Sequence, residues 1–192
     1  MNVPAISPAI SPAADAWLAE QTAAVANGDA VGLAMAFGRA RRHHPDPAAA
    51  RLALVLAIPA TDASAWLATL DRLFATAGLD ELVTLYRGLP RYPHAEMLRL
   101  RAAAGIRSSM QTVFEAVALD NAYPAQWLAD EPFNQMVLKA FFCLCNHRRI
   151  VGLRARANPT LGGMLADYRR ERVVASRPVP PGLEEVVLWC QT

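Results

Sequence analysis

The fold is decided within residues 133–178, by the stretches FNQMVLKAFF (133–142) and RANPTLGGMLADYRRER (156–172). The first is preceded by Asp130, Glu131 and Pro132, which favour a helix start at Asp130. Apolar residues then recur at three- and four-residue steps, which places them on one face of that helix. They are Phe133, Val137, Ala140, Phe141 and Leu144. The pattern predicts an amphipathic helix with a buried stripe.

The second stretch predicts another helix. Asn158 is a typical N-cap, and Pro159 suits the first helical position because its missing N–H has no partner there. The buried side consists of Leu161, Leu165 and Tyr168, with Met164 beside them. Gly162 and Gly163 each cost about 1 kcal/mol relative to alanine in a helix. The pair indicates that another backbone or a ligand comes close at that turn.

The rest of the chain shows the same pattern of amphipathic helices. Amphipathic segments of about three turns are separated by links of roughly two to six residues, and short links make sequential helices antiparallel. We therefore predict an all-α fold without a sheet, an irregular array of antiparallel helical hairpins. Such an array is either a HEAT-like or TPR-like α-solenoid or a compact bundle. We expect residues 1–10 to be a flexible tail and residues 11–192 to be a single domain.

The amphipathic helical pattern is interrupted at ALDNAYPAQWL (118–128). Asp120 and Asn121 are typical of a helix end, and Tyr123 precedes Pro124, which favours an extended backbone at Tyr123. We expect a loop that places carboxylate, amide and phenol groups next to the helix that carries Lys139.

Composition and charge exclude several classes of function. Hydrophobic residues make up 54% of the 192 residues, enough for one substantial core, and the formal net charge of +2 is close to neutral. We therefore expect no general binding to nucleic acid or to anionic membranes. The odd set Cys143, Cys145 and Cys190 is typical of a reducing compartment.

The N-terminal residues show no secretory pattern, because no basic residue precedes Arg39 and prolines interrupt the first apolar stretch. The best apolar run, residues 52–58, is far shorter than the about 20 residues that span a membrane. These patterns predict a cytoplasmic protein without a transmembrane segment.

Lys139 is the only lysine and lies beside apolar residues of its helix. A lysine with a lowered pKa could act as a base or form a Schiff base. Alternatively, its side chain passes Phe142 and ends on Asp120, Glu131 or water. We favour this structural interpretation, since no partner base or phosphate-binding loop accompanies Lys139.

The other candidate residues also allow structural and functional interpretations. Asp120, Asn121 and Tyr123 could bind a polar ligand or simply form a turn. Gln135 lies on the stripe of Lys139, and Asn134 lies near a helix start without a capping role. A buried polar cluster could join the last helices through Arg156, Asp167, Tyr168 and Arg172.

We predict no metal or cofactor. Cys143, Cys145 and His147 are two residues apart, a spacing that points helical side chains to different sides. The chain has no G-x-S-x-G, P-loop or H-E-x-x-H motif, so nothing identifies an enzyme.

Four segments together resemble the bacterial EboA-like family. They are ALDNAYP (118–124), FNQMVLKAFF (133–142), IVGLRARANP (150–159) and MLADYRRER (164–172), so the family-like part covers residues 118–178. The chain departs from the family pattern at Cys143, Cys145, Asn146 and His147, and at Val173, where relatives usually have tryptophan. The resemblance implies a gene set near a membrane prenyltransferase, linked to making or exporting specialised metabolites. It implies no known activity.

Our leading hypothesis is a non-catalytic cytoplasmic protein that binds a protein partner from that gene set, such as the membrane prenyltransferase. The alternative is an enzyme or a binder of a small apolar metabolite. Its pocket would lie between the Asp120 loop and the helices of Lys139 and Tyr168, and would be concave and partly apolar.

Overall fold

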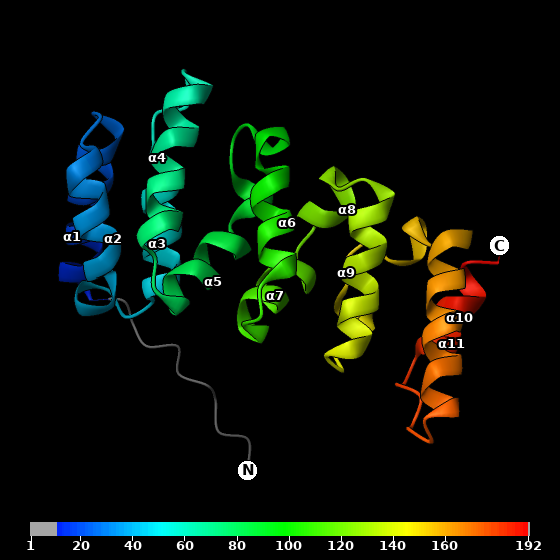
Figure 1. Ribbon diagram of the computed structural model, residues 1–192. Coiled ribbons are helices and arrows are strands. Elements are labelled where there is room, and N and C mark those ends of the chain that lie inside the picture. The colour runs from blue at the N-terminus through cyan, green and yellow to red at the C-terminus, as the bar shows by residue number, and fades with distance from the viewer. Residues whose placement is uncertain (1–10, 192) are drawn as a thin grey trace, which may run out of the picture. The chain divides into compact units, whose positions relative to one another are not determined.

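A computed structural model describes residues 11–191, which form α-helices and short 3-10 helices and contain no β-strand (Figure 1). The predicted all-α fold without a sheet is confirmed. The predicted tail, residues 1–10, lies outside the described residues. The α-helices are α1 Pro12–Ala26, α2 Ala30–His43, α3 Pro47–Leu56, α4 Ala63–Thr76, α5 Leu79–Arg87, α6 Arg99–Arg107, α7 Gln111–Ala118, α8 Tyr123–Trp127, α9 Asp130–Phe142, α10 Pro159–Val174 and α11 Leu183–Trp189. The 3-10 helices are η1 Leu89–Arg91, η2 Ala95–Leu98, η3 His147–Arg149 and η4 Arg154–Arg156.

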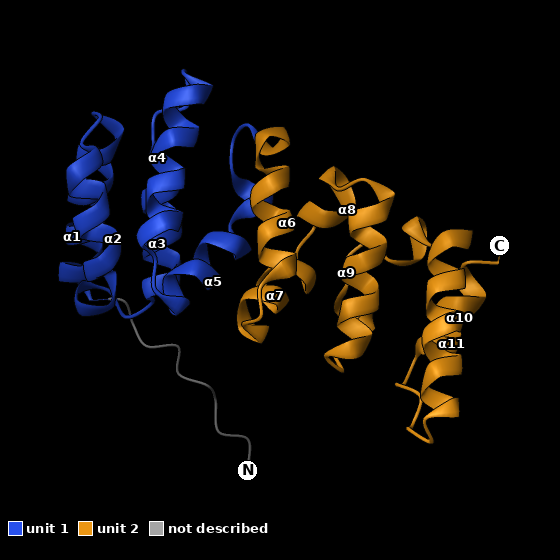
Figure 2. Ribbon diagram, in the orientation of Figure 1, with its two compact units in different colours: residues 1–94 blue, residues 95–192 orange. Residues whose placement is uncertain are grey.

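The chain divides into two compact units, Met1–His94 and Ala95–Thr192 (Figure 2). The prediction that residues 11–192 form a single domain stays a prediction.

In the first unit, α1, α2 and α3 pack on one another, and α5 packs on α3. Aspartates cap three of the helices: Asp29 accepts from Gly32 N, Asp46 from Ala49 N, and Asp62 from Ser64 N and Ala65 N. The cap of α4 is thus Asp62.

Arg51 joins three helices of this unit from a buried position. Its Nε donates to the carbonyl oxygen of Phe37 (3.1 Å), and its Nη2 pairs with Glu81 Oε1 (3.3 Å). A buried guanidinium must be paired in this way, because removing its partner would leave an uncompensated charge inside the protein. Arg51 therefore links α3 to α2 and α5.

In the second unit, α6 packs on α7, and α9 contacts both α7 and α10, while α11 packs on α10. The predicted apolar stripe of α9 is buried at Phe133, Val137, Ala140 and Phe141. Leu144 was expected on the same stripe, but it is 70% exposed. The reason is that α9 ends at Phe142, and Leu144 takes a left-handed φ of 55°.

The loop expected at residues 118–128 contains a helix instead, α8 (Tyr123–Trp127). The expectation of an extended Tyr123 was wrong, since Pro124 stands in the first turn of α8, where the missing N–H leaves no hydrogen bond unmade. Asn121 Oδ1 accepts the Tyr123 N–H (3.0 Å) and so supports the helix start.

The two glycines of α10 differ in what surrounds them. A Cβ on Gly162 would lie 2.8 Å from Cys190 Cβ, whereas a Cβ on Gly163 would meet nothing within 4 Å. The close approach that the pair predicted is therefore made at Gly162, by the chain directly after α11.

We predict opposite effects for alanine at these two positions. Gly162→Ala should lower the free energy of unfolding by about 1–3 kcal/mol, because the new methyl group overpacks the contact with Cys190. Gly163→Ala should raise it by about 0.5–1 kcal/mol, because alanine loses less backbone freedom on folding. Denaturant unfolding of both variants measures the difference, and equal effects would contradict the close α10–Cys190 contact.

Candidate functional site

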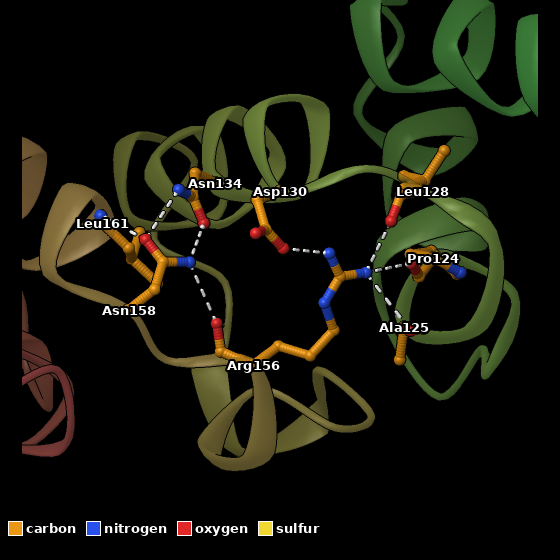
Figure 3. Close-up of polar contacts among 8 residues, drawn as sticks. All are labelled: Pro124, Ala125, Leu128, Asp130, Asn134, Arg156, Asn158 and Leu161. Atoms are coloured by element: carbon orange, nitrogen blue, oxygen red, sulfur yellow. Dashed lines mark hydrogen bonds and ion pairs between the residues drawn. The ribbon is translucent and has the colours of Figure 1, made fainter. Parts of the chain in front are cut away.

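Asn134 and Asn158 form a reciprocal amide pair between α9 and the start of α10 (Figure 3). Asn158 Oδ1 accepts from Leu161 N (3.0 Å) and from Asn134 Nδ2 (3.1 Å). Asn158 Nδ2 donates to Asn134 Oδ1 (3.0 Å) and to the carbonyl oxygen of Arg156 (3.1 Å). All four hydrogen-bonding positions of Asn158 are used, so it has a capping role, as predicted, and Asn134 completes it.

Arg156 binds the end of a different helix. Its Nη1 donates toward the carbonyl oxygens of Pro124 (3.2 Å), Ala125 (3.2 Å) and Leu128 (2.7 Å), at the C-terminal end of α8 (Figure 3). Its Nη2 pairs with Asp130 Oδ1 (2.5 Å), in the first turn of α9. A cation at a helix C-terminus and a carboxylate at a helix N-terminus are both favourable placements. Arg156 thus fixes α8 against α9.

Lys139 contacts neither of its expected carboxylate partners. Its Nζ donates to the carbonyl oxygens of Ile106 (2.6 Å) and Ser108 (2.8 Å), and lies 4.7 Å from the ring centroid of Phe114. Ile106 is in the last turn of α6, where carbonyl groups lack helical partners and carry partial negative charge. The ammonium hydrogens are directed at protein acceptors, which supports a structural role.

Asp120, Asn121 and Tyr123 also bind the protein itself. The Asp120 carboxylate accepts from Arg149 Nε (2.9 Å) and Nη2 (2.6 Å), and the buried Asn121 donates to Ala116 O (2.9 Å). The hydroxyl of Tyr123 donates to Ala95 O (2.6 Å), and burial raises the pKa of Tyr123 to about 12. These three residues connect α7, α8, η3 and the start of the second unit, at Ala95.

The predicted polar cluster of four residues does not form. Arg156 binds α8, whereas Asp167 is exposed and pairs with Arg170 within α10. Tyr168 packs on Phe142, with ring centroids 4.3 Å apart, and Arg172 lies over Tyr168 at 5.9 Å. Sequence spacing could not separate these neighbourhoods, because successive side chains of α10 point in different directions.

Phe142 is the centre of an exposed surface that the sequence did not indicate. Its ring is 57% exposed although it packs on Tyr168, and Leu144 beside it is 70% exposed. Arg172 is held in place by its Nε, which donates to Pro178 O (3.0 Å). We call Phe142, Leu144, Tyr168 and Arg172 the Phe142 surface. Exposed aromatic and arginine side chains of this kind are typical centres of protein interfaces.

Gln135 belongs neither to the contacts of Lys139 nor to the Phe142 surface. Its exposed side chain lines a cavity of about 450 Å³ together with Ala103, Ile106, Arg107, Glu131 and Pro132. The structure therefore places Gln135 on an open groove between α6 and α9.

His147 has a role that sequence reasoning missed. It is buried, stacks on Phe141 with ring centroids 5.7 Å apart, and donates from Nε2 to Glu185 Oε2 (3.2 Å). This hydrogen bond lowers the pKa of Glu185. Gly182 has a left-handed φ of 80°, and a Cβ there would lie 1.9 Å from His147 Cε1. In the sequence, Gly182 was the available indication that another side chain packs at the turn before α11.

The cysteines and histidines give no sign of a reaction centre. Among residues 11–191, no group of three or more His, Cys, Asp or Glu side chains is placed to hold a metal ion. Burial raises the pKa of Cys145 to about 11, so its thiol is protonated and a poor nucleophile at neutral pH. No helix within the described range is long and apolar enough to cross a bilayer.

Comparison with known proteins gives one match. The profile of the family described as metabolite traffic protein EboA matches residues 34–188. No curated protein and no solved structure matches the chain.

We predict that Lys139→Met destabilises the protein. Two backbone carbonyls would lose a charged donor, so the free energy of unfolding should fall by about 1–3 kcal/mol. The control is Gln135→Met, one turn earlier on the same helix, which should change stability by less than about 0.5 kcal/mol because Gln135 is exposed. Thermal and denaturant unfolding measure both. Unchanged stability with lost function would instead favour the pocket around Lys139.

The Asn134–Asn158 pair predicts energetic coupling between α9 and α10. In a double-mutant cycle of Asn134→Ala and Asn158→Ala, the coupling energy should be about 0.5–3 kcal/mol, because each single change removes both hydrogen bonds of the pair. Asn134→Ala combined with Glu171→Ala, at an exposed site of α10, should be additive. Additive effects in the asparagine cycle would contradict the reciprocal pair.

Proposed function

Because the chain belongs to the metabolite traffic protein EboA family, we propose that it is a non-catalytic cytoplasmic protein that binds a protein partner. Through this partner it supports the biosynthesis or export of specialised metabolites. The partner that we propose is a product of the same gene set, the membrane prenyltransferase, contacted from its cytoplasmic side.

The use of the polar side chains carries this proposal. Lys139 and Arg156, two of the candidate residues, and the predicted cap Asn158 bind backbone groups at the ends of α6, α8 and α10. General acid–base or covalent catalysis needs a polar group directed at a substrate. These groups are directed at the protein, which favours a binding role over the alternative enzyme or ligand pocket around Lys139.

The Phe142 surface is the part of the second unit that we assign to the partner. An aromatic ring that is 57% exposed and backed by a buried tyrosine can enter an apolar pocket at little entropic cost. Arg172 adds a cation at its rim, where a carboxylate of the partner could pair with it. The proposed contact is thus apolar at its centre and charged at its edge.

Capture of gene neighbours by tagged protein tests this assignment. The wild type should retain the prenyltransferase in detergent, and Phe142→Asp should reduce the retained amount at least about tenfold, because a buried unpaired carboxylate costs several kcal/mol. Leu100→Asp is the matched control, since Leu100 is an 85% exposed apolar residue on α6, away from the Phe142 surface.

The control should retain the partner as well as the wild type does. A wild-type protein that captures none of its gene neighbours, in detergent as well as in buffer, would contradict the proposal. Equal losses in both variants would contradict the assignment to Phe142.

A further inference from the structure

The first unit contains two adjoining cavities between α2 and α4 that no role above uses. The larger, of about 480 Å³, is lined among others by Val31, Met35, Thr69 and Arg72. The smaller, of about 190 Å³, extends toward Trp66 and Pro59. Both include Ala30, Leu33 and Thr69 in their walls, so they form one continuous groove along the two helices. We call it the α2–α4 groove.

The walls of the groove are apolar and open to solvent. Val31 is 73% exposed and Met35 is 50% exposed, while Leu33 and Leu73 are buried beneath them. The opposite faces of α2 pack on α1 and α3. Leaving such side chains in water forgoes about 25 cal/mol for each square ångström that a ligand could cover.

One guanidinium, that of Arg72, lies in the wall of the larger cavity. Arg72 Nη2 donates to Thr69 Oγ1 (3.0 Å), and the Thr69 hydroxyl in turn donates to Ala65 O (2.9 Å). Arg72 has no ion-pair partner within residues 11–191. The other charged group of the walls, the Asp29 carboxylate, lines the smaller cavity and accepts the Gly32 N–H as the cap of α2. The described lining of the larger cavity therefore combines apolar walls with one cation, Arg72, and contains no carboxylate.

We propose that the α2–α4 groove binds a small, mainly apolar molecule that carries one anionic group, a carboxylate, sulfonate or phosphate. The volume lies within the range of about 300–1,000 Å³ that is typical of small-molecule sites. A guanidinium pairs with such anions through parallel N–H donors. The ligand's apolar body covers Val31 and Met35, and its anion replaces the water on Arg72.

The volume of the larger cavity, about 480 Å³, and the single arginine in its wall suit a small anionic molecule. The site is in the first unit and the Phe142 surface is in the second, so either proposal can fail without the other.

Titration calorimetry with dodecanoate, below its micelle concentration, tests the groove, and dodecanol is the uncharged comparison. We expect the wild type to bind dodecanoate more tightly than dodecanol. Arg72→Gln should weaken dodecanoate binding about tenfold, the value of one charged hydrogen bond, and leave dodecanol unchanged. Arg87→Gln, an exposed arginine of α5, should change neither affinity. Ala34→Trp, which fills the groove from its exposed wall, should abolish binding of both.

Vesicles of phosphatidylglycerol distinguish a lipid ligand from a dissolved one. Sedimentation of wild type with vesicles, lost in Arg72→Gln and Ala34→Trp, would assign the anion to a lipid and support the groove. Circular dichroism must show wild-type helix content in every variant scored. Failure to bind either probe, or equal dodecanoate affinity in wild type and Arg72→Gln, would overturn the proposal. So would an Ala34→Trp variant that loses partner capture but still binds dodecanoate, because the groove would then be a protein contact.

Discussion

The ends of short helices set the constraint on which this structure depends. The α-helices of residues 11–191 are between 5 and 16 residues long, so a large share of the backbone lies in first and last turns. Every helix end leaves N–H and C=O groups without helical partners, and in a packed interior these groups need side chains to satisfy them. Lys139 supplies donors to the end of α6, Arg156 to the end of α8, and Asn158 caps α10. These three polar residues of the second unit serve this task.

The constraint explains why several interior polar groups are joined to distant backbone. Arg156 crosses from η4 to the end of α8, and Lys139 crosses from α9 to the end of α6. Each such contact satisfies a backbone group and also fixes one helix against another. The same interactions therefore stabilise the packing and satisfy the helix ends. A side chain taken from them for catalysis would leave a buried backbone group unpaired, at a cost of about 1–3 kcal/mol.

The sequence predicts the parts of this arrangement that are local. The all-α class, the stripe of α9 and the cap at Asn158 follow from spacings of one to four residues, and they are correct. The prediction that Leu144 is buried is wrong, because the apolar pattern in the sequence continues past the residue at which α9 ends. The partners of Lys139 could not be predicted, because they are backbone carbonyls about thirty residues away, and every residue has a carbonyl. The exposure of Phe142 depends on how α9 packs on α10, and the α2–α4 groove is lined by helices that are not consecutive, so neither follows from local spacing.

The commitment of polar groups to helix ends also bears on the proposed binding role. A reaction centre requires two or more polar groups preorganised toward a substrate, and here the groups that could serve are held by helix ends. Binding requires less: apolar area left uncovered by the packing, and a charge to orient the ligand. The Phe142 surface and the α2–α4 groove meet that lower requirement, since each combines exposed apolar side chains with one arginine held by a neighbour, Arg172 by Pro178 and Arg72 by Thr69. The proposed binding role requires no reaction centre, so it is compatible with a fold in which Lys139, Arg156 and Asn158 are committed to helix ends.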